Sequence, residues 1–247
     1  MIDTAVILAA GLGSRLKNVT EDRPKGFIEI GGTSIIEASV EKLFDTGIKK
    51  IIIGTGYHAE KYDELSETCP DITCIKNSLY PTTGSMYTLY TMKNNISKDF
   101  LLLESDLIYD KSGLVQLMNL PWPDAILASG TTNSDDEVFV ETNEEKFLVN
   151  MSKDRKKLTG IYAELVGISK ISKPTFGKMC KFAERVFYQD QFLDYEYALA
   201  GIARDVNIFV LKIDNYLWAE IDNPAQLARA KKVIYPQILK SELHEEH

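Results

Sequence analysis

The sequence predicts an α/β protein with a Rossmann-like, mainly parallel sheet flanked by helices, joined to a smaller β-rich extension. Over about the first 130 residues, short apolar runs alternate with amphipathic stretches, the pattern of strands alternating with helices. The first apolar run passes directly into a glycine loop, as at a ligand-binding strand end. After about residue 130, β-type runs follow one another over short connections, which predicts the extension.

The apolar runs of the first half are expected to form the strands of the sheet: Ala5–Ala9, Lys50–Gly54, Ile72–Lys76, Phe100–Glu104 and Ala125–Ala128. Helices are expected between them. Ser34 and Glu37 have the spacing of a capping box at a helix start. Ser85–Lys93 and Lys111–Met118 also suit helices. Because carboxyl ends of parallel strands meet at one edge, we expect ligands there.

The runs of the second half predict further strands at Val138–Glu141, Phe147–Met151, Tyr162–Ile168 and Val206–Lys212, and the segment Trp218-Ala219-Glu220-Ile221-Asp222 follows the last of them. Pro174–Phe187 and Leu193–Ala203 suit helices, and Asn223 with Gln226 forms a second capping box before a last helix. We expect one domain over residues 1–240, with a nucleotide-binding core over about 1–130. Residues 131–222 would form the acceptor-binding extension and the return to the core, and the charged tail 241–247 is expected to fray.

Composition excludes several classes of function. The net charge of −8 argues against nucleic-acid binding, and no apolar run approaches the length of a membrane span, so no membrane partner is expected. The three cysteines lack the spacing of a zinc site or a disulfide framework, which fits a cytoplasmic protein. A secretion signal is not expected, because Asp3 precedes the first apolar run and no basic segment does. His58 is the one histidine outside the tail, so histidine-based catalysis is not expected.

The segment from Leu8 to Arg15, followed by Pro24 and Lys25, is the most informative stretch of the chain. Backbone N–H groups just after a strand can hold phosphate oxygens. Leu16 stands where a dinucleotide-binding loop has its third glycine, and the Gly-Lys-Ser/Thr ending of a Walker A loop is absent. A plain strand-to-helix turn is the alternative. The cations after the loop make a triphosphate site the favoured interpretation.

Two aspartates follow apparent strand ends: Asp106 after Phe100–Leu103, and Asp222 after Trp218. Two carboxylates at strand ends suit Mg²⁺, which takes one or two carboxylates together with phosphate oxygens and water. Each aspartate alone would more often be a turn or helix-capping residue. Together with the phosphate loop, they favour a Mg²⁺ site.

These motifs resemble those of the nucleoside-triphosphate transferase family of sugar-nucleotide pyrophosphorylases. That family has a Leu-Ala-Ala-Gly-x-Gly loop with a following arginine, a Pro-Lys about ten residues on, a strand-end aspartate and a late metal-binding aspartate. The resemblance spans nearly the whole chain. Within the family, the chain most resembles the short cytidylyltransferases acting on phosphocholine or 2-aminoethylphosphonate, through Tyr80–Tyr90, Glu104-Ser105-Asp106 and Phe192–Tyr195.

The resemblance implies roles for individual residues. Lys25 would face the α-phosphate of CTP, Arg15 the departing phosphates, and Asp106 and Asp222 would hold Mg²⁺. The remaining nucleotide-binding residues would hold the base and phosphates: Leu8, Ala10, Gly11, Leu12, Gly13, Ser14, Thr83, Gly84, Ser85 and Ser105. No general base is required, because a phosphate or phosphonate oxygen is already ionised near neutral pH.

The acceptor would bind to the second half of the chain, at Ser129, Lys153, Asp194 and Glu196. A solvated hairpin turn is the alternative for the basic run that Lys153 opens, and a helix N-cap is the alternative for Asp194. Carboxylates beside aromatic residues suit a cationic amine. The chain has only two tryptophans, whereas a trimethylammonium group usually needs an aromatic cage, which slightly favours a primary amine.

The sequence therefore predicts a cytidylyltransferase that transfers CMP from CTP to a small aminophosphonate, with 2-aminoethylphosphonate favoured, and releases pyrophosphate. Phosphocholine or a sugar 1-phosphate as acceptor stays an alternative. A non-catalytic regulatory subunit on the same fold is an alternative of another class, although such proteins typically lack the lysine or a metal carboxylate. Whether the chain forms a homodimer is left open.

Overall fold

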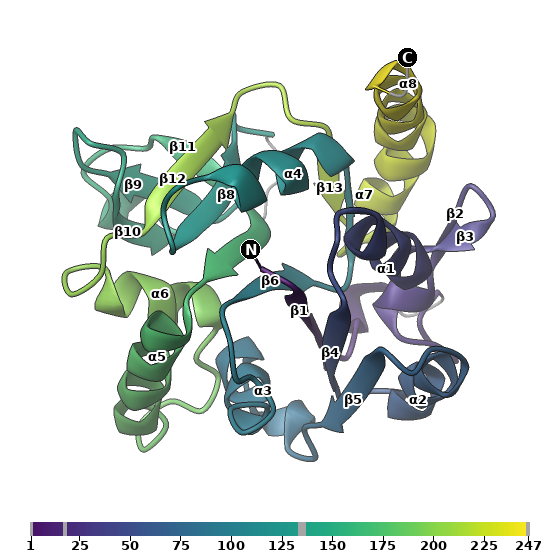
Figure 1. Cartoon of the computed structure of the whole chain (residues 1–247), viewed down its shortest axis with the longest axis horizontal. Helices are drawn as coiled ribbons and strands as arrows, with labels where there is room; N and C mark the ends of the chain where they lie inside the picture. Colours follow the sequence, from purple (N-terminus) through teal and green to yellow (C-terminus); the bar gives the residue numbers. More distant parts are fainter. Residues whose placement is uncertain (1, 17–18, 133–136, 246–247) are drawn as a thin grey trace.

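The computed structural model of the chain describes residues 2–16, 19–132 and 137–245. Within these residues, nine strands form one sheet and helices cover both of its faces (Figure 1). The central strands β6, β1, β4 and β5 run parallel to one another. The mainly parallel, helix-flanked sheet predicted from the sequence is therefore confirmed.

The strand order in the sheet is β10-β9-β11-β6-β1-β4-β5, and β8 pairs with both β11 and β12. Its strands are β1 (Thr4–Ala9), β4 (Lys50–Thr55), β5 (Ile72–Lys76), β6 (Phe100–Glu104), β8 (Ala125–Ser129), β9 (Phe139–Thr142), β10 (Leu148–Ser152), β11 (Ala163–Ile171) and β12 (Phe209–Ile213). The α-helices are α1 (Ile35–Asp45), α2 (Ala59–Thr68), α3 (Ser85–Thr91), α4 (Lys111–Asn119), α5 (Lys173–Val186), α6 (Tyr195–Ile202), α7 (Pro224–Arg229) and α8 (Tyr235–Glu245).

Strand β1 lies at the centre of the molecule, and every one of its residues is buried. Its side chains alternate between two hydrophobic cores, as the two-residue period of a strand requires. Val6 and Leu8 join the core that contains residues of α3, α5 and α6. Ala5 and Ile7 join the core that contains residues of α1 and α4. Both faces of β1 are thus covered by side chains. The loop that begins at Ala10 leaves the sheet from the carboxyl end of this buried strand.

The β-rich extension continues the central sheet, so both halves of the chain share one sheet. Strand β11 pairs antiparallel with β6 through Ile168–Ile171 and with β9 through Ala163 and Glu164. Its register against β8 shifts between Leu165 and Ser169, where Gly167 has a φ of +88°. This irregularity lets one long strand serve both halves of the sheet.

Two short strands outside the main sheet return the chain to the core, and the sequence did not predict their pairing. Strand β13 (Trp218–Glu220) pairs antiparallel with β7 (Leu107–Tyr109). Asn223 then caps α7 through the expected capping box with Gln226. The pairing brings a segment from the end of the chain beside the carboxyl end of β6.

The last helix, α8, runs from Tyr235 to Glu245; residues 246 and 247 of the expected frayed tail lie outside the described part of the chain. Glu242 forms an ion pair with Lys42 of α1 at 2.6 Å and accepts a hydrogen bond from the backbone N–H of Lys111 at 3.1 Å. These contacts hold the last helix against α1 and α4. No helix within the described ranges is long and apolar enough to cross a membrane.

The loop that follows β1, residues 10–15, is called the first loop below. Gly56, just after β4, offers a test of how tightly the fold packs this loop. A Cβ at Gly56 would lie 2.7 Å from the carbonyl oxygen of Ala10 and from the Tyr80 side chain. We expect Gly56→Ala to lower the free energy of unfolding by about 1–3 kcal/mol through overpacking, measured by urea denaturation. Gly177→Ala is the matched control. It meets nothing within 4 Å and lies inside α5, so a gain of up to about 1 kcal/mol is expected there. Equal effects of the two substitutions would contradict the tight packing.

Candidate active site

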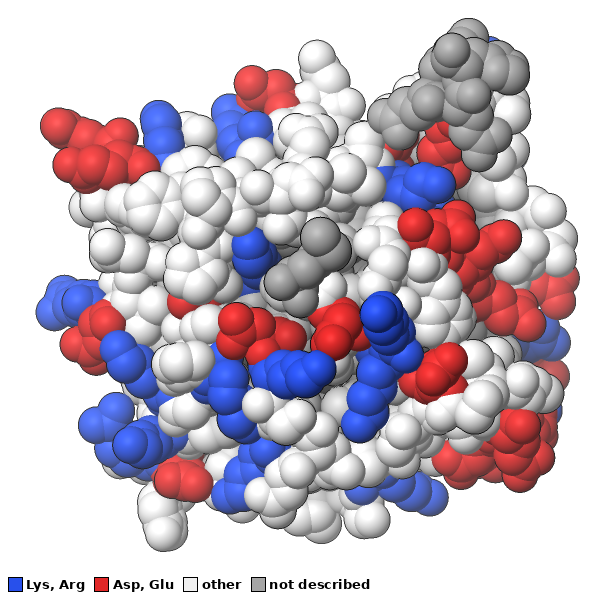
Figure 2. Space-filling model, in the orientation of Figure 1, with Lys and Arg blue, Asp and Glu red and all other residues white. Residues whose placement is uncertain are grey.

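A cavity of about 440 Å³ opens at the carboxyl ends of β1 and β6, where ligands are expected in an α/β sheet. Acidic and basic side chains lie next to each other in the middle of the face shown in Figure 2. Six acidic and three basic side chains line the cavity: Glu104, Asp106, Asp194, Glu196, Glu220 and Asp222, and Arg15, Lys25 and Lys153. The cavity is therefore rich in charge and has more carboxylates than cations.

Lys25 lies at the centre of this charged cluster. Its ammonium group contacts Asp106 Oδ2 at 2.8 Å and also donates to Asp222 Oδ1. Arg15 contacts the other oxygen of Asp222 at 2.8 Å. Burial disfavours the charged form of Lys25, but the two carboxylates outweigh it and raise the lysine's pKa. The structure thus joins the four residues that the resemblance implied to be catalytic.

Backbone contacts between distant segments bring these side chains together. The N–H of Ser105 donates to the carbonyl of Leu8 at 3.1 Å, and the N–H of Ile221 donates to the carbonyl of Asp106 at 3.0 Å. Gln226 accepts from the N–H of Asp222 at 2.8 Å. The first loop, the end of β6 and the start of α7 are therefore tied to one another around the cavity.

The carboxylates of the cavity fit a divalent cation. Oxygen atoms of Glu104, Asp106 and Glu220 lie within 4.8 Å of one another, and carboxylate oxygens are the ligands that Mg²⁺ prefers. Burial, followed by the charges of Asp106 and Glu196, raises the pKa of Glu104. Burial and the charges of Glu104 and Asp106 raise that of Glu220. A triphosphate would add negative charge to this cavity, so a compensating cation suits the site.

The first loop contributes part of the residues expected from it. Leu8, Ala10, Gly11 and Arg15 line the cavity, whereas Leu12, Gly13 and Ser14 do not. Gly13 has a φ of +63°, and a Cβ there would lie 3.2 Å from the Lys25 side chain and from Thr20. A glycine at this position therefore allows the backbone turn and the close packing of the Lys25 side chain.

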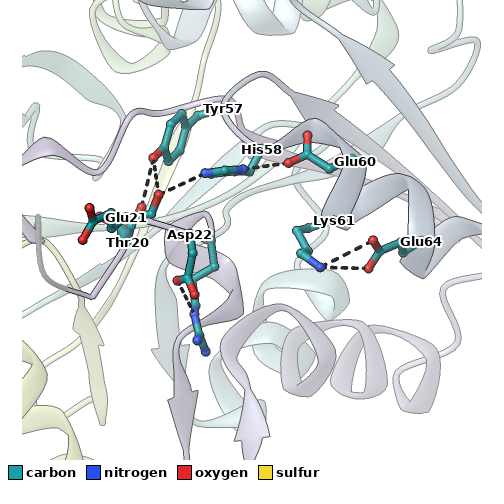
Figure 3. Close-up of polar contacts among 9 residues, drawn as sticks. Thr20, Glu21, Asp22, Tyr57, His58, Glu60, Lys61 and Glu64 are labelled. Carbon is teal, nitrogen blue, oxygen red and sulfur yellow. Dashed lines mark hydrogen bonds and ion pairs between the residues drawn. The ribbon is translucent and has the colours of Figure 1, made fainter.

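Tyr57 and His58, after β4, hold the segment that follows the first loop (Figure 3). The hydroxyl of Tyr57 donates to the carbonyls of Thr20 and Glu21, at 3.1 Å each. The His58 ring contacts the Glu21 carbonyl at 3.3 Å and the Glu60 carboxylate at 2.7 Å. His58 therefore has partners that the sequence did not indicate, and its contacts support the loop.

The expected pyrimidine-binding residues Thr83, Gly84 and Ser85, together with Ser105, all line the cavity. The small size of Gly84 has a packing reason, because a Cβ there would lie 2.4 Å from the backbone oxygens of Phe192 and Leu193. The Gly84 N–H also donates to the carbonyl of Gln191 at 2.8 Å. The start of α3 is thus fastened to the segment before α6.

The structure separates the four residues expected to bind the acceptor. Lys153, Asp194 and Glu196 line the cavity. Ser129 is 2% exposed and is outside the residues that line the cavity. Its hydroxyl accepts from Trp218 Nε1 at 2.9 Å and donates to the carbonyl of Gly130 at 2.7 Å. Strand β8 turns this side chain into the fold, where Ser129 supports Trp218.

Asp194, expected to bind the acceptor or to cap the helix that follows it, makes contacts that the sequence did not indicate. Its Oδ1 accepts from both the backbone N–H and the hydroxyl of Ser85, at 3.1 and 3.0 Å. It precedes α6 but makes no side-chain capping bond there. Asp194 therefore secures the start of α3.

The cavity residues that sequence reasoning missed include two glutamates beside the expected metal ligands, and a tyrosine. Glu104 and Glu220 each lie two positions before an expected metal ligand and line the cavity. Tyr195, which also lines it, donates its hydroxyl to Glu104 Oε1 at 2.7 Å. The paired spacing of Glu104-Ser105-Asp106 and Glu220-Ile221-Asp222 was the signal that could have revealed the two glutamates.

Comparisons with known proteins support the fold and the family that the motifs suggested. Residues 4–121 match the family model of nucleotidyl transferases. The resemblance inferred from the motifs is therefore confirmed.

Several relatives extend the likeness beyond that segment. The chain is 29% identical over 237 residues to the bifunctional protein GlmU of Methanococcus maripaludis, covering 95% of this chain but 55% of the relative. It is 23% identical to the choline-phosphate cytidylyltransferase of Streptococcus pneumoniae, covering 93% and 97%. It is 24% identical to the 2-aminoethylphosphonate cytidylyltransferase of Lancefieldella rimae, covering 91% and 90%. The chain thus spans about half the length of some curated relatives and most of the length of others.

The fold itself recurs in a solved structure, the inositol-1-phosphate CTP transferase from T. maritima. The TM-score is 0.81 at 19% identity, over 97% of this chain and 96% of that one. At this identity the likeness shows the fold alone.

Two substitutions of Asp194 separate its charge from its hydrogen bonds to Ser85. Asparagine keeps an acceptor oxygen, so we expect Asp194→Asn to spare the KM for CTP, whereas Asp194→Ala should raise it about tenfold through loss of bonds to a charged group. If the negative charge of Asp194 helps to bind the acceptor, both variants should raise the KM for the acceptor. Steady-state kinetics measure the constants, with the exposed Asp205→Asn as control. A KM for CTP unchanged in Asp194→Ala would contradict the role in securing α3.

Proposed function

We propose that the protein is a cytidylyltransferase that transfers CMP from CTP to a small aminophosphonate, with 2-aminoethylphosphonate favoured, and releases pyrophosphate. One observation carries the proposal. The strand-end loop, Lys25 and the carboxylates of Asp106 and Asp222 meet in one cavity. Relatives named as cytidylyltransferases, which align over most of their own length, support it.

The proposed reaction is an in-line displacement at the α-phosphorus of CTP by an acceptor oxygen. Such a transfer needs positioning and charge stabilisation more than proton transfer. Lys25 would stabilise the negative charge that develops on the α-phosphate. Arg15, 55% exposed at its side chain, is placed to turn toward the departing phosphates. The loop residues Ala10 and Gly11 would present backbone N–H groups to the nucleotide.

Asp106 and Asp222 would hold Mg²⁺ in this site, and Glu104 and Glu220 lie next to them. When bound, the ion would supply positive charge to the phosphate oxygens. Lys25 contacts both aspartates, so the lysine lies beside the carboxylates that would bind the metal. This proximity supports a shared role at the α-phosphate.

The acceptor would enter from the side of the extension. Lys153 lines both the main cavity and a smaller adjoining cavity, where it can pair with the acceptor's phosphonate. Glu196 lines the same two cavities and is 7% exposed, which suits a carboxylate that pairs with an amine. Phosphocholine is the second candidate acceptor, and the choline-phosphate cytidylyltransferase relative favours it.

An acceptor panel tests the proposal directly. With Mg²⁺ and CTP, we expect pyrophosphate release to depend on 2-aminoethylphosphonate or phosphocholine, because the cavity offers carboxylates for a cationic group. Coupled detection of pyrophosphate measures the rate, and reactions with glucose 1-phosphate or without acceptor serve as controls. Release with sugar phosphates alone would overturn the proposed acceptor class. Release with another nucleoside triphosphate but not with CTP would overturn the choice of CTP.

The proposed role of Lys25 predicts a large kinetic effect. We expect Lys25→Ala to lower kcat by about 10²–10³-fold, the usual loss when one well-placed stabilising group is removed. The exposed Lys49→Ala provides a control for loss of a positive charge elsewhere. Circular dichroism checks that the variant folds, since Asp106 and Asp222 lose their partner. A folded variant with nearly the original kcat would refute the catalytic role.

A further inference from the structure

Glu104, the last residue of β6, lies where two cavities join. The main cavity and a smaller one of about 70 Å³ on the side of the extension share four lining residues: Glu104, Lys153, Glu196 and Glu220. Leu8 and Glu104 stand opposite each other in the pairing of β1 with β6. Glu104 is therefore placed between the nucleotide-binding loop and the part of the site formed by the extension.

The fold makes specific room for the Glu104 carboxylate. Gly167 has a φ of +88°, and a Cβ at this position would lie 3.1 Å from Glu104 Cδ and Oε1. Tyr195 donates its hydroxyl to Glu104 Oε1 at 2.7 Å. The glycine of β11 and the tyrosine of α6 thus both contribute to holding the carboxylate in one position.

No basic side chain within the described part of the chain makes an ion pair with Glu104, and Tyr195 provides its hydrogen bond. The smaller cavity adds to the imbalance, with five glutamates lining it against Lys153 and Arg229: Glu104, Glu137, Glu164, Glu196 and Glu220. A buried carboxylate is costly unless it is paired. A cationic group of a bound ligand would supply the missing charge.

The lining of the smaller cavity also indicates which kind of cation fits. Trp218 is its one aromatic residue among the described lining residues, so an aromatic cage for a quaternary ammonium is not formed there. A primary ammonium carries three N–H donors for carboxylate oxygens. Glu104 and Asp106 are only two residues apart. A cation bound by Glu104 would therefore lie close to the reacting end of the acceptor.

On the basis of the proposed function, we infer that Glu104 is a specificity-determining residue that binds the primary ammonium group of the acceptor. Tyr195 and Gly167 act as positioning residues that keep its carboxylate at the junction of the two cavities. The acceptor's phosphonate then lies toward Lys153 and Asp106, and its amine lies toward the smaller cavity.

The test compares two acceptors that differ only in the amine, 2-aminoethylphosphonate and ethylphosphonate, by pyrophosphate release with Mg²⁺ and CTP. We expect the unmodified protein to prefer the amine. Glu104→Gln should lower the ratio of the two kcat/KM values by about 10- to 100-fold, the loss expected for a hydrogen bond between charged partners. Tyr195→Phe should lower the ratio in the same direction by a smaller factor. Glu145→Gln, exposed in the turn between β9 and β10, is the matched control.

A role as metal ligand is the rival that the test must separate. On our inference, the Kd for Mn²⁺ in the presence of CTP, measured by titration, should change by no more than about twofold in Glu104→Gln. Weaker Mn²⁺ binding with equal losses for both acceptors would overturn it. An unchanged ratio in both folded variants would also overturn it, and would leave the proposed function intact. If the unmodified protein uses neither phosphonate, the proposed acceptor class fails, and the inference fails with it.

Discussion

The contact of one buried ammonium group with two carboxylates is the interaction on which the rest of the site depends. Lys25 contacts Asp106 and Asp222, which come from segments 116 residues apart in the chain. The side chain of Asp222 is 2% exposed, and removing the partner of a buried charge costs about 3–5 kcal/mol. The sheet, the β7–β13 pair and the cap of α7 all bring these three residues within reach. The same cluster that balances charge in the folded chain is the one suited to a metal and a triphosphate.

Acidic side chains outnumber basic ones where the site meets the extension, with Lys153 as the one cation among the four described residues that line both cavities. The cations Arg15 and Lys25 lie beside the first loop, whereas Glu104, Glu196 and Glu220 lie where the main cavity meets the smaller one. On the proposed function, the nucleotide would lie toward the first loop and the cationic group of the acceptor toward these glutamates. The distribution of the carboxylates follows from where the chain turns, because acidic residues alternate at the ends of β6 and β13.

Local sequence patterns predicted the candidate site only in part. The capping boxes at Ser34 and Asn223 depend on neighbours three residues apart, so they were predicted correctly. The contacts of Ser129 were not predicted, because the direction of its side chain depends on the pairing of β8 with β11 and on contact with Trp218. Glu104 was overlooked although its spacing from Asp106 was a local signal. What no local pattern indicated is how its carboxylate is held, because Gly167 and Tyr195 are distant from it in sequence.

The sequence by itself determined the α/β class, the glycine loop at the end of the first strand and the charged residues near it, because strand periodicity and loop composition are local properties. Only the tertiary structure decided which of these residues meet. The antiparallel continuation of the sheet through β11 and the pairing of β13 with β7 are long-range contacts that no short pattern specifies. They place Asp222 beside Lys25 and Glu104 beside the extension, since strand pairing fixes the position of every residue at a strand's end.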